Sequence, residues 1–176
     1  MELSKSIPFS LIEQTEQTNN LVIVLPGAGY TTQAPLLRFT TSLFYNKGFD
    51  VLHINYSYNR QELSELNEED FARDVQLVIN NAIKNKKYCK YYVVGKTVGT
   101  IALSYLLNNT MFKEARVVWL TPLLQKDRVY NAMINSDHKG LCIIGDKDSC
   151  FIEDRFVRLK NNPNLILKVV DGGNHS

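Results

Sequence analysis

The sequence predicts a three-layer α/β/α sandwich around a mainly parallel β-sheet. Two observations lead to this fold class. Continuous apolar runs, typical of strands buried on both faces, alternate along the chain with segments whose apolar residues recur at helical spacing. Glycines and polar residues directly follow four of the apolar runs, where parallel strands would end at one edge of the sheet.

In the first half of the chain, three buried strands are expected to alternate with three helices. The strands are residues 21–25, 51–55 and 91–94, and residues 7–12 form a candidate edge strand. The helices are residues 34–47, 67–85 and 98–107. Gly48 ends the first helix, and Asn67 is a favourable N-cap for the second.

The second half continues the alternation with shorter elements. The sequences ARVVWLTP, GLCIIGDKD and NLILKVV each contain an apolar run that predicts a strand, and the first of these strands ends at Pro122. Helices are expected at residues 126–135 and 153–160. Connections of this kind between successive strands favour a parallel sheet that is covered by helices on both faces.

Length and charge limit the kinds of protein that this chain can be. With 176 residues it can bury a substantial core, and residues 1–176 are expected to form a single domain. The net charge of +2 gives no argument for nucleic-acid binding. No apolar run is long enough to span a membrane, and residues 1–10 lack the apolar stretch of a signal peptide.

The three cysteines indicate neither a metal site nor a disulfide framework. Their number is odd, and they lie at no spacing that is typical of metal ligands. We therefore expect a cytoplasmic protein that uses no metal and no cofactor.

The turn GKTVG, residues 95–99, follows the strand at 91–94 and precedes a helix. Gly95 and Gly99 flank Thr97 and permit a sharp strand-to-helix turn, as in the nucleophile elbow Gly-x-Ser-x-Gly. The Gly-Lys-Thr sequence also ends the phosphate-binding loop of many nucleotide-binding proteins. That loop requires a glycine at position 90, which is Lys90 here, and the intervening residues read as a strand. The elbow is therefore the better interpretation, with Thr97 in the place of the nucleophile.

A hydroxyl nucleophile needs a base and a carboxylate that orients the base. Of the three histidines, His53 lies within a strand and His138 in a polar turn, whereas His175 follows the last strand. His175 is therefore the candidate base. The strand exit GDKDSCF offers Asp148 as the carboxylate, with Asp146 as the alternative.

These segments together resemble the small bacterial α/β-hydrolase superfamily proteins that are dienelactone-hydrolase-like. The resemblance covers VIVLPGAGY, VVGKTVGT, WLTPLL, GDKDSCF and GGNHS, which is nearly the whole chain. It implies an α/β-hydrolase fold with Thr97, Asp148 and His175 as catalytic residues. It also implies an oxyanion hole made by the backbone amides of Val98 and of either Ala28 or Gly29.

Two departures from that family affect the expectation. The family commonly has serine where this sequence has Thr97, and its chains usually continue past the histidine into a final helix, which this sequence lacks. We expect the added methyl group to restrict the nucleophile and slow turnover. We also expect residues 172–176 to be poorly ordered, with His175 away from Thr97, and an uncovered sheet face to mediate self-association.

The function that follows from these residues is hydrolysis of a small ester, thioester or related acyl substrate through a Thr-Asp-His triad. The alternative is a catalytically weak or inactive pseudo-hydrolase that binds a ligand or a partner in the same cleft. In the first case the partner is a small acyl substrate, and a homo-oligomer fits the expected exposed sheet face.

Overall fold

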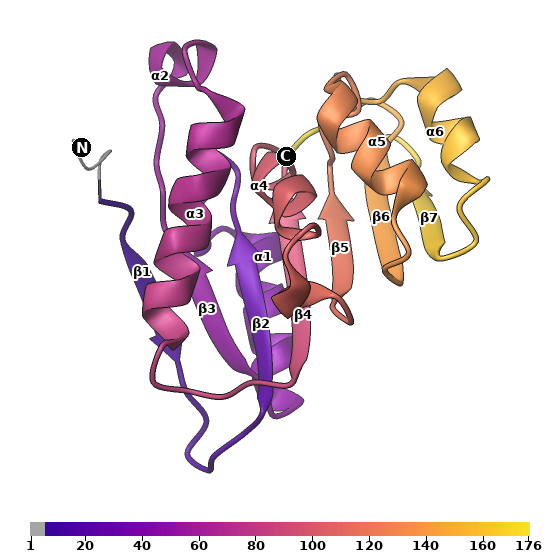
Figure 1. Cartoon of the computed structure of the whole chain (residues 1–176). Coiled ribbons are helices and arrows are strands. Elements are labelled where there is room, and N and C mark those ends of the chain that lie inside the picture. Colours follow the sequence, from indigo (N-terminus) through magenta and orange to yellow (C-terminus); the bar gives the residue numbers. More distant parts are fainter. Residues whose placement is uncertain (1–5) are drawn as a thin grey trace.

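The computed structural model describes residues 6–176, and these contain a sheet of seven strands (Figure 1). The order across the sheet is β1-β3-β2-β4-β5-β6-β7. The edge strand β1 pairs antiparallel with β3, and every other neighbouring pair is parallel. The strands are β1 (Phe9–Ile12), β2 (Asn20–Leu25), β3 (Asp50–Ile54), β4 (Lys90–Lys96), β5 (Arg116–Leu120), β6 (Gly140–Gly145) and β7 (Leu165–Val170). The prediction of a mainly parallel sheet is confirmed, with β4 at its centre.

Helices cover both faces of the sheet, but unevenly (Figure 1). They are α1 (Pro35–Asn46), α2 (Arg60–Ser64), α3 (Glu68–Ile83), α4 (Gly99–Leu106), the 3₁₀ helix η1 (Thr110–Phe112), α5 (Asp127–Asn135) and α6 (Glu153–Leu159). The long helix α3 and the helices α4, α5 and α6 lie on one face, and α1 lies on the other. Among the described residues, no helix combines the length and the apolar character that crossing a bilayer would require.

Two apolar cores hold the layers together. The larger core lies between the sheet and α3 to α6 and includes Phe71, Leu103 and Trp119, all of which are almost fully buried. The smaller core lies under α1 and is centred on Leu37 and Val94. Burial of a large apolar side chain contributes about 1.5–3 kcal/mol to the free energy of unfolding, so the larger core accounts for most of the stability.

A close backbone contact places the start of α4 against the sheet. A Cβ atom at position 99 would overlap the carbonyl oxygen of Leu25, at the end of β2, so only glycine fits there. The first turn of α4 can therefore lie directly on the carboxyl end of the neighbouring strand. This contact fixes where the turn between β4 and α4 sits in the sheet.

The face of the sheet that carries α1 is incompletely covered over β5, β6 and β7. Val118 and Ile143 on this face are only partly buried. On the edge strand β7, Ile166 is 61% exposed and Val170 is 48% exposed. The register pairs β6 and β7 so that both side chains share the α1 face. Phe39 of α1 is 68% exposed, so apolar surface is exposed on both the helix and the sheet.

Candidate active site

Thr97 occupies the turn that joins the central strand β4 to α4. Its φ angle is 51°, which is in the left-handed region that β-branched residues rarely adopt. The Thr97 amide donates to the carbonyl of Leu120 on β5 at 3.1 Å, and its carbonyl accepts from the Thr100 amide at 2.9 Å. Such a conformation costs about 1–3 kcal/mol and persists where the surrounding structure imposes it. This is the local geometry that the nucleophile-elbow interpretation predicts.

His175 lies against Thr97, although it is far away in sequence. Its Nε2 atom is 2.9 Å from Oγ1 of Thr97, and its Nδ1 atom is 2.8 Å from Oδ1 of Asp148. A neutral imidazole that donates from Nδ1 to the carboxylate presents Nε2 as an acceptor for the Thr97 hydroxyl. The three side chains thus form one chain of hydrogen bonds with the geometry of a nucleophile, a base and an orienting acid.

The prediction that His175 stands away from Thr97 is wrong. Backbone hydrogen bonds hold the segment after β7, because Gly173 donates to Val170 at 3.0 Å and accepts from Lys147 at 2.9 Å. The ammonium of Lys96 also donates to the carbonyl of His175 itself at 2.9 Å. These contacts position the imidazole against Thr97.

Of the two carboxylates considered, Asp148 is the one beside the imidazole. Its side chain is fully buried, and Oδ1 also accepts a hydrogen bond from the Cys150 amide at 2.7 Å. Asp146 makes no hydrogen bond to His175, and its buried Oδ1 atom has no partner among residues 6–176. The turn therefore presents the second aspartate of the GDKD sequence, not the first.

The surroundings of His175 favour its protonated form. A hydrogen bond with the Cys150 side chain raises the pKa of the imidazole, and so do the hydrogen bond and the charge of Asp148. Partial burial acts in the opposite direction, but the pKa lies above its usual value of 6.5. A base with a raised pKa accepts the proton of a hydroxyl more readily.

Two further side chains, which were not predicted from the sequence, complete the site. Lys96 is the last residue of β4 and is only 1% exposed. Its Nζ atom donates to Oγ1 of Thr121 at 3.1 Å, and this hydroxyl lies 3.1 Å from Oγ1 of Thr97. The sequence does contain a signal for Lys96. It lies two residues after Val94 and four after Tyr92, so the alternation of side chains along a strand places its charged group on the same face of the sheet as these two residues.

The backbone amides proposed for the oxyanion hole have no hydrogen-bond partner among the described residues. They belong to Val98, at the N-cap of α4, and to Ala28 and Gly29, in the loop after β2. That loop approaches the elbow, because a Cβ atom at Gly27 would lie 3.7 Å from Oγ1 of Thr97. Free amides near a hydroxyl are what an oxyanion hole requires, and their role stays a prediction.

The other two histidines have structural partners away from this site. His53 is buried in β3, and its Nε2 atom lies 2.8 Å from Oγ1 of Thr41. Both ring nitrogens of His138 are hydrogen-bonded, to Ser136 and to the carbonyl of Phe112. Neither ring is available as a general base for Thr97.

The residues Asp148, Cys150 and His175 are also of types that can ligate a metal, and their ligand atoms all lie within 4.8 Å of one another. In this arrangement, however, His175 Nδ1 and Asp148 Oδ1 are engaged with each other. The geometry is that of a base and its orienting carboxylate, so the residues themselves do not argue for a bound metal.

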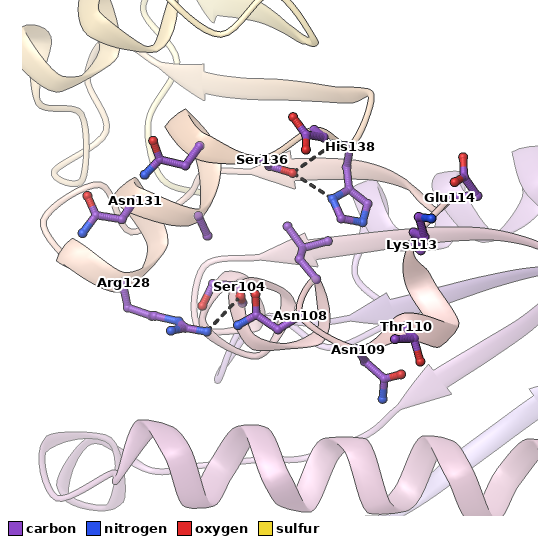
Figure 2. A pocket seen from close by; sticks show the side chains of 14 residues that line it. Ser104, Asn108, Asn109, Thr110, Lys113, Glu114, Arg128, Asn131, Ser136 and His138 are labelled. Carbon is purple, nitrogen blue, oxygen red and sulfur yellow. Dashed lines mark hydrogen bonds between the residues drawn. The ribbon is translucent and has the colours of Figure 1, made fainter.

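A separate cleft of about 690 Å³ lies beside α4, η1 and α5 (Figure 2). None of Thr97, Asp148 and His175 lines it. Arg128 stacks at 3.9 Å on the ring of Tyr105 and donates to the carbonyl of Ser104 at 3.4 Å. Ser136 Oγ and His138 Nδ1 are 2.9 Å apart in this cleft, but the other ring nitrogen of His138 is bonded to the carbonyl of Phe112 and not to a carboxylate, so the pair lacks the orienting acid of a triad.

Comparison with solved structures identifies the fold. No protein-family model and no curated protein matches the sequence. The structure is similar to Est1E from Butyrivibrio proteoclasticus, solved with ferulic acid bound, with a TM-score of 0.75 and 12% identity over 96% of this chain and 87% of that one. For the Pyrococcus furiosus esterase Pf2001 the TM-score is 0.70, with 16% identity over 96% and 84% of the two chains.

A third similar structure is XC6422 from Xanthomonas campestris, an α/β serine hydrolase without a lid. Its TM-score is 0.68, with 13% identity over 96% of this chain and 79% of that one. The chain has the α/β-hydrolase fold. In this α/β-hydrolase fold, Thr97 occupies the turn after the central strand, and Asp148 and His175 follow β6 and β7 at the same edge of the sheet.

Proposed function

We propose that this protein hydrolyses a small ester, thioester or related acyl substrate, with Thr97 as the nucleophile. The observation that supports the proposal most directly is the chain of hydrogen bonds from Thr97 Oγ1 to His175 Nε2 and from His175 Nδ1 to Asp148 Oδ1. A buried carboxylate, an imidazole with a raised pKa and a hydroxyl in hydrogen-bond contact supply the groups that acyl transfer needs.

The first half of the proposed reaction forms an acyl-enzyme. Oγ1 of Thr97 attacks the acyl carbon while His175 Nε2 takes the hydroxyl proton. The substrate oxygen becomes negative and accepts hydrogen bonds from the amides of Val98 and of Ala28 or Gly29, each worth about 3 kcal/mol in such sites. His175 then gives the proton to the departing alkoxide or thiolate, and the acyl group stays on Thr97.

The second half releases the acid and regenerates the site. His175 Nε2 takes a proton from a water molecule, which attacks the acyl carbon. The bond to Oγ1 of Thr97 breaks, and the hydroxyl recovers its proton from the imidazolium. Asp148 fixes the tautomer of the imidazole and stabilises its charged form in both halves of the reaction.

The methyl group of Thr97 is expected to slow both halves of the proposed reaction. It lies on a β-branched side chain in a left-handed turn, where few rotamers are available. A displacement of about 1 Å at a reacting atom can cost about a hundredfold in rate. We therefore propose a slow hydrolase whose hydroxyl is correctly paired but sterically restricted.

The pseudo-hydrolase alternative has less support. A protein that only binds a ligand gains nothing from a buried Asp148 carboxylate aimed at His175, because burial of a charge is costly. The restriction at Thr97 favours this alternative.

Hydrolysis of p-nitrophenyl acetate tests the proposal. Wild-type protein should release nitrophenolate faster than buffer, and Thr97→Ala and His175→Ala should reduce the rate to the buffer level. Thr41→Val is a matched control, since it also removes a hydrogen-bonded hydroxyl, but one that lies on α1. Equal rates in wild type and Thr97→Ala would contradict the proposal.

A further inference from the structure

We infer that Lys96 and Thr121 are positioning residues that orient the Thr97 hydroxyl toward its base and hold the base in place. This inference rests on the proposed function, because it concerns how the same nucleophile is prepared. It is carried by two short contacts: Lys96 Nζ to Thr121 Oγ1 at 3.1 Å, and Thr121 Oγ1 to Thr97 Oγ1 at 3.1 Å.

The chemistry of the donors gives this chain of hydrogen bonds one direction. An ammonium group can only donate, so Lys96 donates to Oγ1 of Thr121. The hydrogen of the Thr121 hydroxyl is then free to point at Oγ1 of Thr97, 3.1 Å away. Oγ1 of Thr97 accepts this bond, which leaves its own hydrogen for Nε2 of His175 at 2.9 Å. The hydroxyl proton is thereby aimed at the base.

Lys96 is held by three acceptors of its ammonium group. They are Oγ1 of Thr121, the carbonyl oxygen of His175 at 2.9 Å and the ring face of Tyr30, 4.4 Å from Nζ. Burial lowers the pKa of Lys96, and the charge of Asp148 opposes that shift. One side chain therefore contacts the backbone of the base and the hydroxyl beside the nucleophile.

The backbone of Thr121 supports a role at the site. Its φ angle is 43°, so two β-branched residues in contact, Thr97 and Thr121, both adopt the left-handed conformation. The Thr121 amide donates to the carbonyl of Ile143 on β6 at 2.8 Å, which anchors the turn after β5. Strained conformations of this kind cluster at functional sites, and here the strained turn brings the Thr121 hydroxyl to Thr97.

The hydrogen bonds from Lys96 to Thr121 and from Thr121 to Thr97 should affect the chemical step more than substrate binding. As Thr97 loses its proton to His175, negative charge grows on Oγ1. The Thr121 hydroxyl donates to that oxygen and is itself polarised by the Lys96 ammonium. The stabilisation grows as charge develops, so removal of the Thr121 hydroxyl should lower kcat and leave KM nearly unchanged.

The experiment compares Thr121→Val with Thr121→Ser in p-nitrophenyl acetate hydrolysis. Valine keeps the β-branched shape and the backbone strain but removes the hydroxyl, whereas serine keeps the hydroxyl. We expect Thr121→Val to lower kcat by about ten- to a hundredfold at unchanged KM, which is the value of one charge-assisted hydrogen bond. Thr121→Ser should retain the wild-type kcat, and Thr41→Val is again the matched control.

A folded Thr121→Val variant with wild-type kcat would overturn the inference, and so would an equal loss in Thr121→Val and Thr121→Ser. Thr97→Ala separates this result from a failure of the proposed function. If Thr97→Ala is inactive and Thr121→Val is fully active, only the inference fails. If Thr97→Ala is as active as wild type, the proposed function fails and the inference fails with it.

Discussion

Gly145 and Gly173 lie in direct backbone contact, so that a Cβ atom at position 145 would overlap the carbonyl group of Gly173. This contact joins the end of β6 to the segment after β7. The same segment is fixed by hydrogen bonds of Gly173 with Lys147 and Val170. Because His175 is only two residues further along, the contact determines where the imidazole lies relative to Thr97.

We predict that Gly145→Ala reduces hydrolysis of p-nitrophenyl acetate by at least about tenfold, because displacement of His175 by a fraction of an ångström weakens its contact with Thr97. Thermal unfolding should change little, since the variant displaces the segment after β7 and leaves the core in place. Gly48→Ala is the control. It places alanine at a φ of 82° far from the site, so it should lower the free energy of unfolding by about 1–2 kcal/mol without loss of activity.

Thr97→Ser should raise kcat on a small activated ester. The variant keeps the hydroxyl and removes the methyl group that restricts its rotamer. It also relieves crowding at a turn whose φ angle is 51°. Steady-state kinetics on p-nitrophenyl acetate measure the effect. A correctly folded Thr97→Ser variant that is no faster than wild type would show that the methyl group is not the obstacle.

The pH dependence of activity should report the raised pKa of His175. The imidazole accepts a proton only when it is neutral, so kcat/KM rises with pH through the pKa of the free protein. Because contacts with Cys150 and Asp148 raise that pKa above 6.5, the midpoint of the rise should lie above pH 6.5. Cys150→Ala removes the hydrogen bond that raises the pKa of His175 most, so it should move the midpoint to lower pH. A wild-type midpoint at or below pH 6.5 would contradict this assignment.

Self-association through the α1 face of the sheet is a separate prediction. Phe39, Ile166 and Val170 expose apolar surface on this face, and exposed apolar patches commonly mark contact surfaces between proteins. Sedimentation velocity should show a dimer or larger species whose proportion grows with concentration. Ile166→Lys should shift the distribution of species toward monomer. Leu77→Lys, which changes an exposed residue of α3 on the opposite face of the sheet, should not shift it. A wild-type protein that stays monomeric at all concentrations would contradict the prediction.

The sequence was sufficient to predict the elements whose signals are local. Buried strands appear as continuous apolar runs, and Asn67 does cap α3 by accepting a hydrogen bond from the Asp70 amide. The elbow was predictable because Gly95 and Gly99 must be small for one turn to pack on the sheet. Short helices were missed, since α2 depends on a capping box between Asn59 and Glu62 and has no apolar periodicity.

The parts of the site that were missed depend on contacts between distant segments. Thr121 reaches Thr97 only because β5 is the neighbour of β4 in the sheet. The residues of a single strand do not specify which strand lies beside it, so this contact could not be predicted. The position of His175 depends on Gly145 and Lys96, which lie on two other strands. A single sequence gives the chemical types of these residues but not their distances.

Covalent labelling is the most direct test of the central claim that Thr97 is an activated nucleophile. Wild-type protein is treated with a fluorophosphonate, digested, and analysed by mass spectrometry to locate the adduct. We expect an adduct on the Thr97 hydroxyl that is absent in Thr97→Ala and forms far more slowly in His175→Ala. Correctly folded protein with no adduct, or with its adduct on another residue, would show that Thr97 is not an activated nucleophile.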